Sequence, residues 1–295
     1  MWKEKFIQYL RYEKGYSSLT EISYLKDLSQ FEAFMIQTCG DFDCRTIDSD
    51  LIRIWMSGLM ESGLTARTVN RKLSAVKSFF KYLKRMDVVE RNPAERISAP
   101  KISKKLPAFA NDKELCQVLD HAPADTDDFQ GIRNPFIIEL LYLTGIRRSE
   151  LIALKDSDID FYSCAIRVTG KRNKQRIIPF SNATKEKLKR YIEVRDAEIK
   201  DKSPFLFVNR SGAPLRPRQV YSIVNRQLAG ISTLSKKSPH TLRHSFATEM
   251  LNNGAEISVV KEILGHSNLA STEVYTHVTF DELKRVYQNA HPRAN

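Results

Sequence analysis

The spacing of hydrophobic residues predicts a helical first domain over residues 1–98. Trp2, Phe6 and Leu10 recur every four residues and therefore share one face of a helix. The Ser-Leu-Thr-Glu run at 18–21 has the pattern of a capping box, which predicts that a second helix begins there. The apolar positions expected in this second helix include Ile22, Leu25 and Phe34.

Third and fourth helices are expected over about 50–63 and 66–86. In the fourth, apolar residues alternate four and three apart and form one face: Val69, Leu73, Val76, Phe80 and Leu83. The other side carries basic residues, among them Arg67, Arg71, Lys77 and Lys81. Such a stripe is typical either of a solvated amphipathic helix or of a helix that follows a DNA backbone by neutralising phosphates. These four residues are therefore candidate DNA contacts.

The composition changes at residues 99–107, where two prolines flank a basic segment without periodicity, which is typical of a linker. The second domain, residues 108–295, mixes helical and strand patterns. Helices are expected over 136–143, 147–154 and 217–228. Strands are expected over 165–168, 176–180 and 205–208. The first two strands form a hairpin with Lys171 and Lys174 at its tip, so we expect a mainly α protein whose second domain contains a small sheet.

Near the C-terminal end, the residues 239–277 concentrate polar side chains of catalytic type. His240 and Arg243 are three apart and share a helix face, while Leu242, Phe246 and Met250 recur every four residues on the opposite stripe. A second helical pattern over 257–264 stops at Gly265, and His266 follows in a turn. Ser271 is a candidate N-cap for a last turn that carries Tyr275. An imidazole and a guanidinium on one face of a helix whose other face is buried are suited to hold a phosphate between them. We therefore expect a phosphate-binding site here.

Charge and composition narrow the class of protein. The 295 residues include 47 Lys and Arg against 35 Asp and Glu, a net charge of +12, which favours a polyanionic partner. No apolar run approaches the length of a membrane span, and the first residues lack a signal peptide. The four cysteines are irregularly spaced and are expected to be reduced thiols. We therefore expect a soluble cytoplasmic protein.

Metal and nucleotide chemistry find little support in the sequence. His240 and His244 have zinc-ligand spacing, but Thr241 stands where a His-Glu-x-x-His hydrolase has its glutamate. The alternating aspartates at 156, 158 and 160 are more typical of a turn before a strand than of an ion site. No phosphate-binding loop of the Gly-x-x-x-x-Gly-Lys-Ser/Thr type occurs. We expect neither a metal nor another cofactor.

Six residues follow, in order, the signature of the tyrosine recombinase or phage integrase family: Arg147, Lys171, His240, Arg243, His266 and Tyr275. Three local runs match as well: Thr-Gly-Ile-Arg-Arg-Ser-Glu-Leu, Leu-Arg-His-Ser-Phe-Ala-Thr and Leu-Gly-His-Ser. The chain resembles this family over nearly its whole length, and most closely the Xer-type site-specific recombinases. The resemblance implies an N-terminal SAM-like, four-helix core-binding domain and an α+β catalytic domain of the tyrosine recombinase fold.

The resemblance also implies site-specific DNA recombination without metal or ATP, through a 3′-phosphotyrosyl intermediate and a Holliday junction. Tyr275 would be the nucleophile and Lys171 the general acid for the 5′-oxygen. His240 would assist the deprotonation of Tyr275, and His266 would hydrogen-bond the phosphate.

Arginine suits the phosphate itself, because its planar donors grip two oxygens and its charge is permanent. We expect Arg147 and Arg243 to form a phosphate clamp. Glu150, three residues after Arg147, either forms a merely structural ion pair or orients the working arginine. Arg172 and Lys174 are further candidate contacts with the DNA backbone.

The partner implied is a double-stranded DNA recombination site that holds a tetramer. A second related recombinase and a septal DNA translocase are candidate partners if the role is chromosome-dimer resolution. The residues 280–295 are expected either to dock on a neighbouring protomer or to pack on their own domain. The alternatives are a mobile-element or phage integrase, a type IB topoisomerase-like enzyme and a non-catalytic DNA-binding protein. The lack of room for an arm-binding domain before Trp2 favours the Xer type over an integrase.

Overall fold

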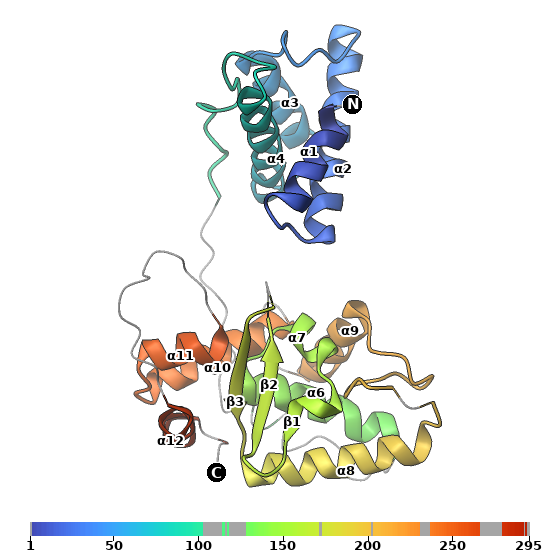
Figure 1. The fold of residues 1–295 in the computed structure, drawn as a ribbon, viewed down its shortest axis with the longest axis vertical. Helices are drawn as coiled ribbons and strands as arrows, with labels where there is room; N and C mark the ends of the chain where they lie inside the picture. The colour runs from blue at the N-terminus through green and yellow to red at the C-terminus, as the bar shows by residue number, and fades with distance from the viewer. Residues whose placement is uncertain are drawn as a thin grey trace. The chain divides into compact units, whose positions relative to one another are not determined.

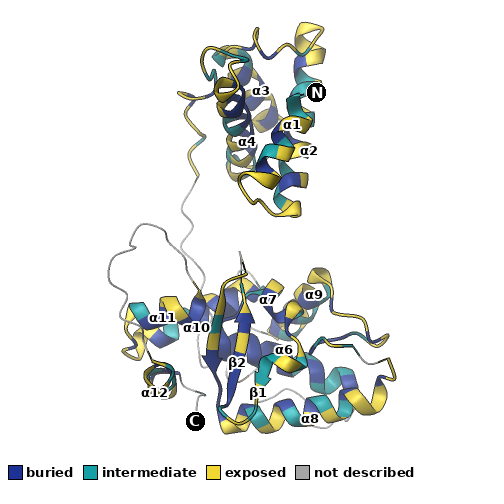
Figure 2. Cartoon of the chain, viewed as in Figure 1, coloured by how far each residue is buried: buried dark blue, intermediate teal, exposed yellow. Residues whose placement is uncertain are grey.

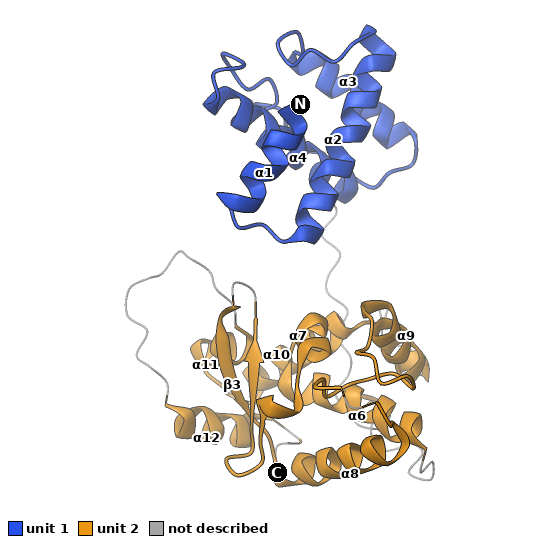
Figure 3. Ribbon diagram, turned by 45° about the vertical axis from the view of Figure 1, so that its right-hand side comes forward, with its two compact units in different colours: residues 1–105 blue, residues 106–295 orange. Residues whose placement is uncertain are grey.

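The computed structural model describes residues 2–102, 114, 115, 117, 128–170, 173–201, 203–230, 237–265, 279–291 and 293. The chain divides into two compact units, residues 1–105 and residues 106–295 (Figure 3). Each unit has its own hydrophobic core.

The first unit is built from helices, in agreement with the periodicity of its sequence (Figure 1). They are α1 (Trp2–Tyr12), α2 (Ser18–Cys39), α3 (Ser49–Glu61) and α4 (Ala66–Arg85). All five apolar positions predicted for α4 are buried, at most 2% exposed. Aromatic rings fill the centre, where Phe31 lies edge-on against Trp55 with the ring centroids 4.9 Å apart.

Helix α2 differs from its expected form in two respects. Ser17 is the N-cap, because its hydroxyl accepts a hydrogen bond from the backbone N–H of Thr20, so the helix begins one residue earlier than the predicted capping box implies. Of the apolar positions expected to be buried, Ile22 and Leu25 are 62% and 40% exposed. The face that packs against α1 and α4 is formed instead by Leu28, Phe31 and Met35.

The second unit combines a three-stranded antiparallel sheet with helices. The strands, in the order β1-β2-β3, are β1 (Ile159–Asp160), β2 (Ala165–Thr169) and β3 (Gln175–Pro179). The predicted hairpin is confirmed as β2 and β3, with Val168 opposite Arg176. The run 205–208 is not a strand, since it makes only isolated bridges from Phe205 to Lys155 and from Val208 to Pro214.

The helices of this unit surround a central one. They are α6 (Phe129–Thr144), α7 (Arg148–Ala153), α8 (Asn182–Glu198), α9 (Pro217–Gln227), α10 (Pro239–Asn252), α11 (Ile257–Leu264) and α12 (Phe280–Ala290). Helix α6 packs against α8, α9 and α10, and every residue of its second half except Glu139 is buried (Figure 2). Helices α11 and α12 lie beside β3 (Figure 1).

The apolar face of α12 is packed within its own unit in this single chain. Leu283 and Tyr287 are 5% and 1% exposed, and the helix contacts α10 and β3. The side-chain amide of Asn253 also donates to the carbonyl of Ala290 at 2.8 Å. The apolar face of α12, for which docking on a neighbour was one of two expectations, is therefore occupied here by contacts of its own unit.

Gly145 ends α6 in a left-handed conformation, with φ of 58°. An added methyl group at this position is expected to destabilise the second unit. A Cβ atom there would lie 2.5 Å from Cδ1 of Phe246 and 2.8 Å from Cδ2 of Leu264, both in the core. Because steric overlap adds to backbone strain, Gly145→Ala is expected to lower the free energy of unfolding of the second unit by about 3 kcal/mol.

Gly254→Ala is the matched control, because φ there is 84° and no heavy atom lies within 4 Å of the added Cβ. It is expected to cost only about 1 kcal/mol. Chemical denaturation followed by far-UV circular dichroism measures both variants. Both tryptophans of the chain, Trp2 and Trp55, belong to the first unit, so their fluorescence should report an unchanged transition. Equal losses in the two variants would contradict the steric argument.

Candidate active site

Arg147 lies between α6 and α7, and both its backbone N–H and its guanidinium are held by hydrogen bonds. Its backbone N–H donates to Oε2 of Glu150 at 2.8 Å, which closes the first turn of α7. Nη1 of its guanidinium donates to Oε1 of the same carboxylate at 2.8 Å. Nη2 donates to the carbonyl of Gly265 at 3.1 Å. The side chain stays 34% exposed, so the guanidinium is both oriented and accessible.

Arg243, on α10, is directed at the same place. Its Nη1 donates to the carbonyl of Gly145 at 2.5 Å, and its Nη2 to the carbonyl of Leu264 at 2.6 Å. The two expected clamp residues therefore bind adjacent carbonyls, Leu264 and Gly265, at the end of α11. Arg243 is only 8% exposed, more buried than a position opposite the apolar stripe of α10 implies. The ends of α6 and α11 flank it and account for this burial.

A third guanidinium, that of Arg176 on β3, completes the cluster. Its Nη1 and Nη2 donate to Oε1 and Oε2 of Glu150 at 3.1 and 2.8 Å, and its Nε donates to the carbonyl of Ile263 at 2.5 Å. Sequence reasoning missed this role. The signal was available, because strand alternation places Arg176 on the same face as the buried Ile178, where a charged residue requires a partner.

The cluster carries excess positive charge among its described members: three arginines surround Glu150, which is 4% exposed. Burial raises the pKa of Glu150, but hydrogen bonds from Arg176 and from the backbone N–H of Arg147 outweigh it and leave the pKa below its usual value. Burial, together with the charges of Arg147 and Arg176, lowers the pKa of Arg243 to about 10. The carbonyl end of α11 offsets part of the repulsion, since a helix is negative there. Such a cluster favours an anion.

The other expected site residues are placed only in part. His240 is exposed in the first turn of α10, and Lys174 is exposed at the base of the hairpin tip. Lys171, Arg172, His266 and Tyr275 lie outside the described residues. Gly170, which precedes Lys171 in the sequence, adjoins the cluster, since a Cβ there would lie 3.3 Å from Oε1 of Glu150.

The basic face of α4 divides into exposed and engaged side chains. Arg67 and Lys81 are exposed. Arg71 forms a two-pronged ion pair with Asp27 of α2 and is still half-exposed. Lys77 donates to the carbonyls of Ile97 and Glu95 at 2.8 and 3.3 Å, and so holds the segment that follows the helix. Of the four predicted contacts, Arg67 and Lys81 have the side chains most available to a ligand.

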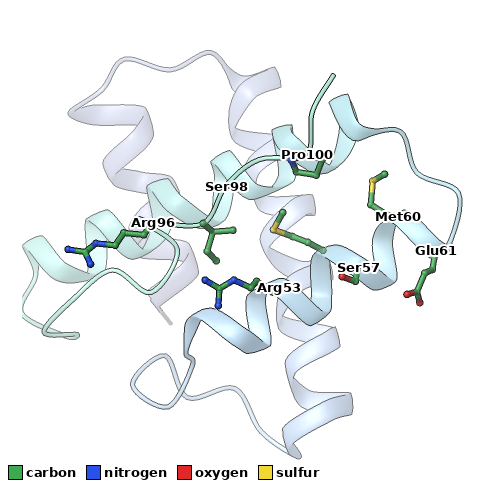
Figure 4. A pocket seen from close by; sticks show the side chains of 9 residues that line it. Arg53, Ser57, Met60, Glu61, Arg96, Ser98 and Pro100 are labelled. Carbon is green, nitrogen blue, oxygen red and sulfur yellow. The ribbon is translucent and has the colours of Figure 1, made fainter. Parts of the chain in front are cut away.

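A hollow of about 510 Å³ lies in the first unit, between α3 and the residues 96–100 (Figure 4). Arg53, Met56 and Met60 line it from the helix. Arg53 already forms an ion pair with Asp50. None of the expected catalytic residues belongs to this hollow.

Two absences hold for the described part of the chain. No group of three or more His, Cys, Asp or Glu side chains there could hold a metal ion. The three aspartates considered for an ion site are engaged otherwise: Asp156 pairs with Arg195, Asp158 pairs with Arg167, and Asp160 accepts from the backbone N–H groups of residues 162 and 163. None of the helices described is both long and apolar enough to cross a membrane.

Comparison with known proteins gives matches over both units. The phage integrase family matches residues 109–282, and the N-terminal SAM-like domain of phage integrases matches residues 4–87. The tyrosine recombinase XerC of Bacillus licheniformis is 41% identical, over 98% of this chain and 96% of its own length. The tyrosine recombinase XerC of Anoxybacillus flavithermus is 42% identical, over 98% and 97%.

Solved structures share the fold. The XerH site-specific recombinase bound to its palindromic difH substrate gives a TM-score of 0.72 at 23% identity, over 97% of this chain and 94% of that chain. The Tn1549 transposon integrase in complex with circular intermediate DNA gives 0.72 at 20% identity, over 96% and 98%. The mainly helical architecture with a small antiparallel sheet thus agrees with the expected fold. On the family match and the relatives near 40% identity, the chain belongs to the phage integrase family and is a tyrosine recombinase.

Proposed function

We propose that this recombinase cleaves and rejoins a double-stranded DNA site with Arg147 and Arg243 as the clamp on the scissile phosphate. The observation that carries the proposal is the convergence of these two guanidiniums, one from the N-cap of α7 and one from α10, on the adjacent carbonyls of Leu264 and Gly265. A phosphate that enters the cluster would meet donors already aimed at one region, and so would need little reorganisation.

Tyr275 supplies the nucleophile in this proposal. Its phenol oxygen forms a bond to phosphorus at the 3′ side, and the bond from phosphorus to the 5′-oxygen breaks. The phenol proton passes to His240, while Lys171 protonates the leaving 5′-oxygen. His266 hydrogen-bonds the phosphate. The ester conserves bond energy, so a second DNA end reverses the step without ATP.

The other contacts with DNA would come from the basic surface. Glu150 supports the clamp by orienting Arg147. Arg67, Arg71, Lys77 and Lys81 on the first unit, with Arg172 and Lys174 on the hairpin, would follow the phosphate backbone. The first domain expected from the sequence, residues 1–98, would bind the core of the site, joined by the linker 99–107 to the catalytic domain, residues 108–295. Exposure favours Arg67 and Lys81 as the stronger contacts.

Chromosome-dimer resolution in the cytoplasm is the cellular role we favour over mobile-element integration. The relatives near 40% identity are named XerC, whereas the transposon integrase is similar at 20% identity only. The assembly would be a tetramer on two duplexes, with a second related recombinase and a septal DNA translocase as partners. The segment 280–295 would leave the contacts of α12 in its own unit and dock on a neighbouring protomer.

The decisive experiment traps the covalent intermediate. The purified protein is incubated with the host's candidate recombination site carrying a nick beside the scissile phosphate, so that the freed fragment diffuses away. We expect a protein–DNA adduct that digestion and mass spectrometry map to Tyr275, with a free 5′-hydroxyl on the released fragment. An adduct on another residue, or none, would refute the proposed chemistry. Relaxation of a supercoiled plasmid without the site would instead indicate a topoisomerase-like enzyme.

A further inference from the structure

Three consecutive carbonyls at the end of α11 bind three different arginines. Ile263 accepts from Nε of Arg176, Leu264 from Nη2 of Arg243, and Gly265 from Nη2 of Arg147, at 2.5, 2.6 and 3.1 Å. The last carbonyls of a helix have no partner within the helix, and they lie at its negative end. The end of α11 thus serves as a common acceptor for the whole cluster.

Arg176 differs from the other two because it also holds the carboxylate of Glu150 with both of its Nη atoms. Glu150 in turn holds Arg147 through the backbone N–H and through Nη1. The hydrogen bonds run from Ile263 through Arg176, Glu150 and Arg147 to Gly265. The backbone from Ile263 to Gly265 closes them into a ring. Arg147 is therefore braced by Arg176 along two routes, the carboxylate and the end of α11.

Two glycines leave the space that this ring requires. A Cβ on Gly265 would lie 3.2 Å from Nη1 of Arg176, and a Cβ on Gly170 would lie 3.3 Å from Oε1 of Glu150. Both distances are tighter than ordinary contacts, so any side chain would displace the guanidinium or the carboxylate. Gly265 also has a φ of 63°, which disfavours other residues.

Arg176 is placed to support the clamp and not to bind the phosphate. Each of its three side-chain nitrogens donates to a protein acceptor, and two of them hold both carboxylate oxygens of Glu150, which in turn holds Arg147. Arg176 is the second residue of β3, just after the tip of the hairpin. A displacement of the hairpin would therefore be transmitted through Arg176 to Arg147.

We propose that Arg176 is a positioning residue of the recombinase: it aims Arg147 through Glu150, and it holds the start of β3, next to the hairpin tip, against the end of α11. The inference rests on the proposed function, because it assigns Arg147 to the phosphate. The inference adds that the β2–β3 hairpin, whose sequence includes Lys171, is connected to Arg147 and Arg243 by hydrogen bonds.

The test compares Arg176→Met and Arg176→Lys with Arg167→Met, which removes a half-exposed arginine of the same sheet that pairs with Asp158. DNA affinity and the single-turnover rate of adduct formation on the nicked site are measured at saturating protein. We expect Arg176→Met to keep its affinity within about threefold and to react about 50-fold more slowly, as a loss of orientation does. Arg176→Lys should recover part of the rate, because one ammonium holds either Glu150 or Ile263 but not both. Arg167→Met should react normally.

A double-mutant cycle with Glu150→Gln separates positioning from general damage to the fold. If both residues act on Arg147 by the same route, the double variant should be no more than about threefold slower than the slower single variant. Rates that multiply would overturn the proposal. If Arg176→Met does not fold, the same cycle is run with Arg176→Lys.

Hydrogen exchange on the protein without DNA provides a readout that does not depend on catalysis. In Arg176→Met the amide of Arg147 and the amides of the last turn of α11 should exchange faster, while those of α8 stay unchanged. If the wild-type protein forms no adduct but these amides exchange faster in the variant, the proposed function fails, while the support of Arg147 by Arg176 is upheld. If the wild-type protein cleaves and the variant matches it in both rate and exchange, the inference fails alone.

Discussion

Tyr275→Phe is expected to bind the recombination site normally and to form no detectable covalent adduct. The substitution removes only the phenol oxygen that would bond to phosphorus. An apolar ring of nearly the same shape remains, so the fold and the DNA contacts should persist. No other group of the proposed site is a suitable nucleophile, and the loss should therefore exceed about 10⁴-fold in the rate of adduct formation. Denaturing electrophoresis of the nicked, labelled site measures it.

Tyr162→Phe is the matched control for this variant. Tyr162 lies in the turn between β1 and β2, is 98% exposed, and belongs to the same unit. Its phenol is accessible to any reagent, but no arginine cluster is described near it. The control should retain the wild-type rate. An adduct in Tyr275→Phe, or its loss in Tyr162→Phe, would show that the nucleophile is assigned to the wrong residue.

The fold was predictable where one periodic pattern extends over many residues. The five apolar positions of α4 repeat over four turns and all are buried, because a long helix presents one stripe to the core. Shorter signals were less reliable. Ile22 and Leu25 fit the periodicity of α2 but lie on its exposed side, since nothing in the sequence tells which of two apolar stripes meets α1 and α4.

The run 205–208 shows a different limit of sequence reasoning. Phe205, Leu206 and Val208 have strand propensity, and Leu206 and Val208 are fully buried. A strand also needs a neighbour in register, and this segment finds only isolated bridges to Lys155 and Pro214. Burial of an apolar run is a local property that the sequence reveals, whereas strand pairing depends on the tertiary arrangement.

The candidate site was predictable to the extent that its residues follow a familiar order along the chain. Arg147 and Arg243 were expected to form a phosphate clamp; their guanidiniums meet at the end of α11, and their role on a phosphate stays a prediction. Arg176 was not expected, because its role depends on where β3 meets Glu150 and Ile263, 26 and 87 residues away. A motif specifies residues that touch the substrate, but their supports come from contacts that only the folded chain brings together.

Arg243→Ala is expected to slow adduct formation by about 10²- to 10³-fold, the usual cost of one donor to a developing negative charge. The fork of Arg243 binds Gly145 and Leu264 with separate nitrogens, so it holds the junction of α6 and α7 against α11. DNA affinity should fall by less than about threefold, because many other phosphates contribute to it. Parallel titration and single-turnover measurements on the nicked site separate the two effects.

Arg243→Lys decides whether charge alone accounts for the loss. The ammonium keeps the charge, but its compact shape cannot occupy both carbonyl sites and present a second donor, so its rate should stay near that of Arg243→Ala. Burial and the charge of Arg147 lower the pKa of Arg243, so Arg243→Ala removes a costly buried charge and should remain folded, whereas Arg243→Lys keeps a charge at this position. Arg210→Ala, which removes a 69% exposed arginine paired with Asp128, controls for the loss of positive charge as such. Full activity in Arg243→Lys would mean that a point charge suffices, and the clamp geometry would then have no bearing on catalysis.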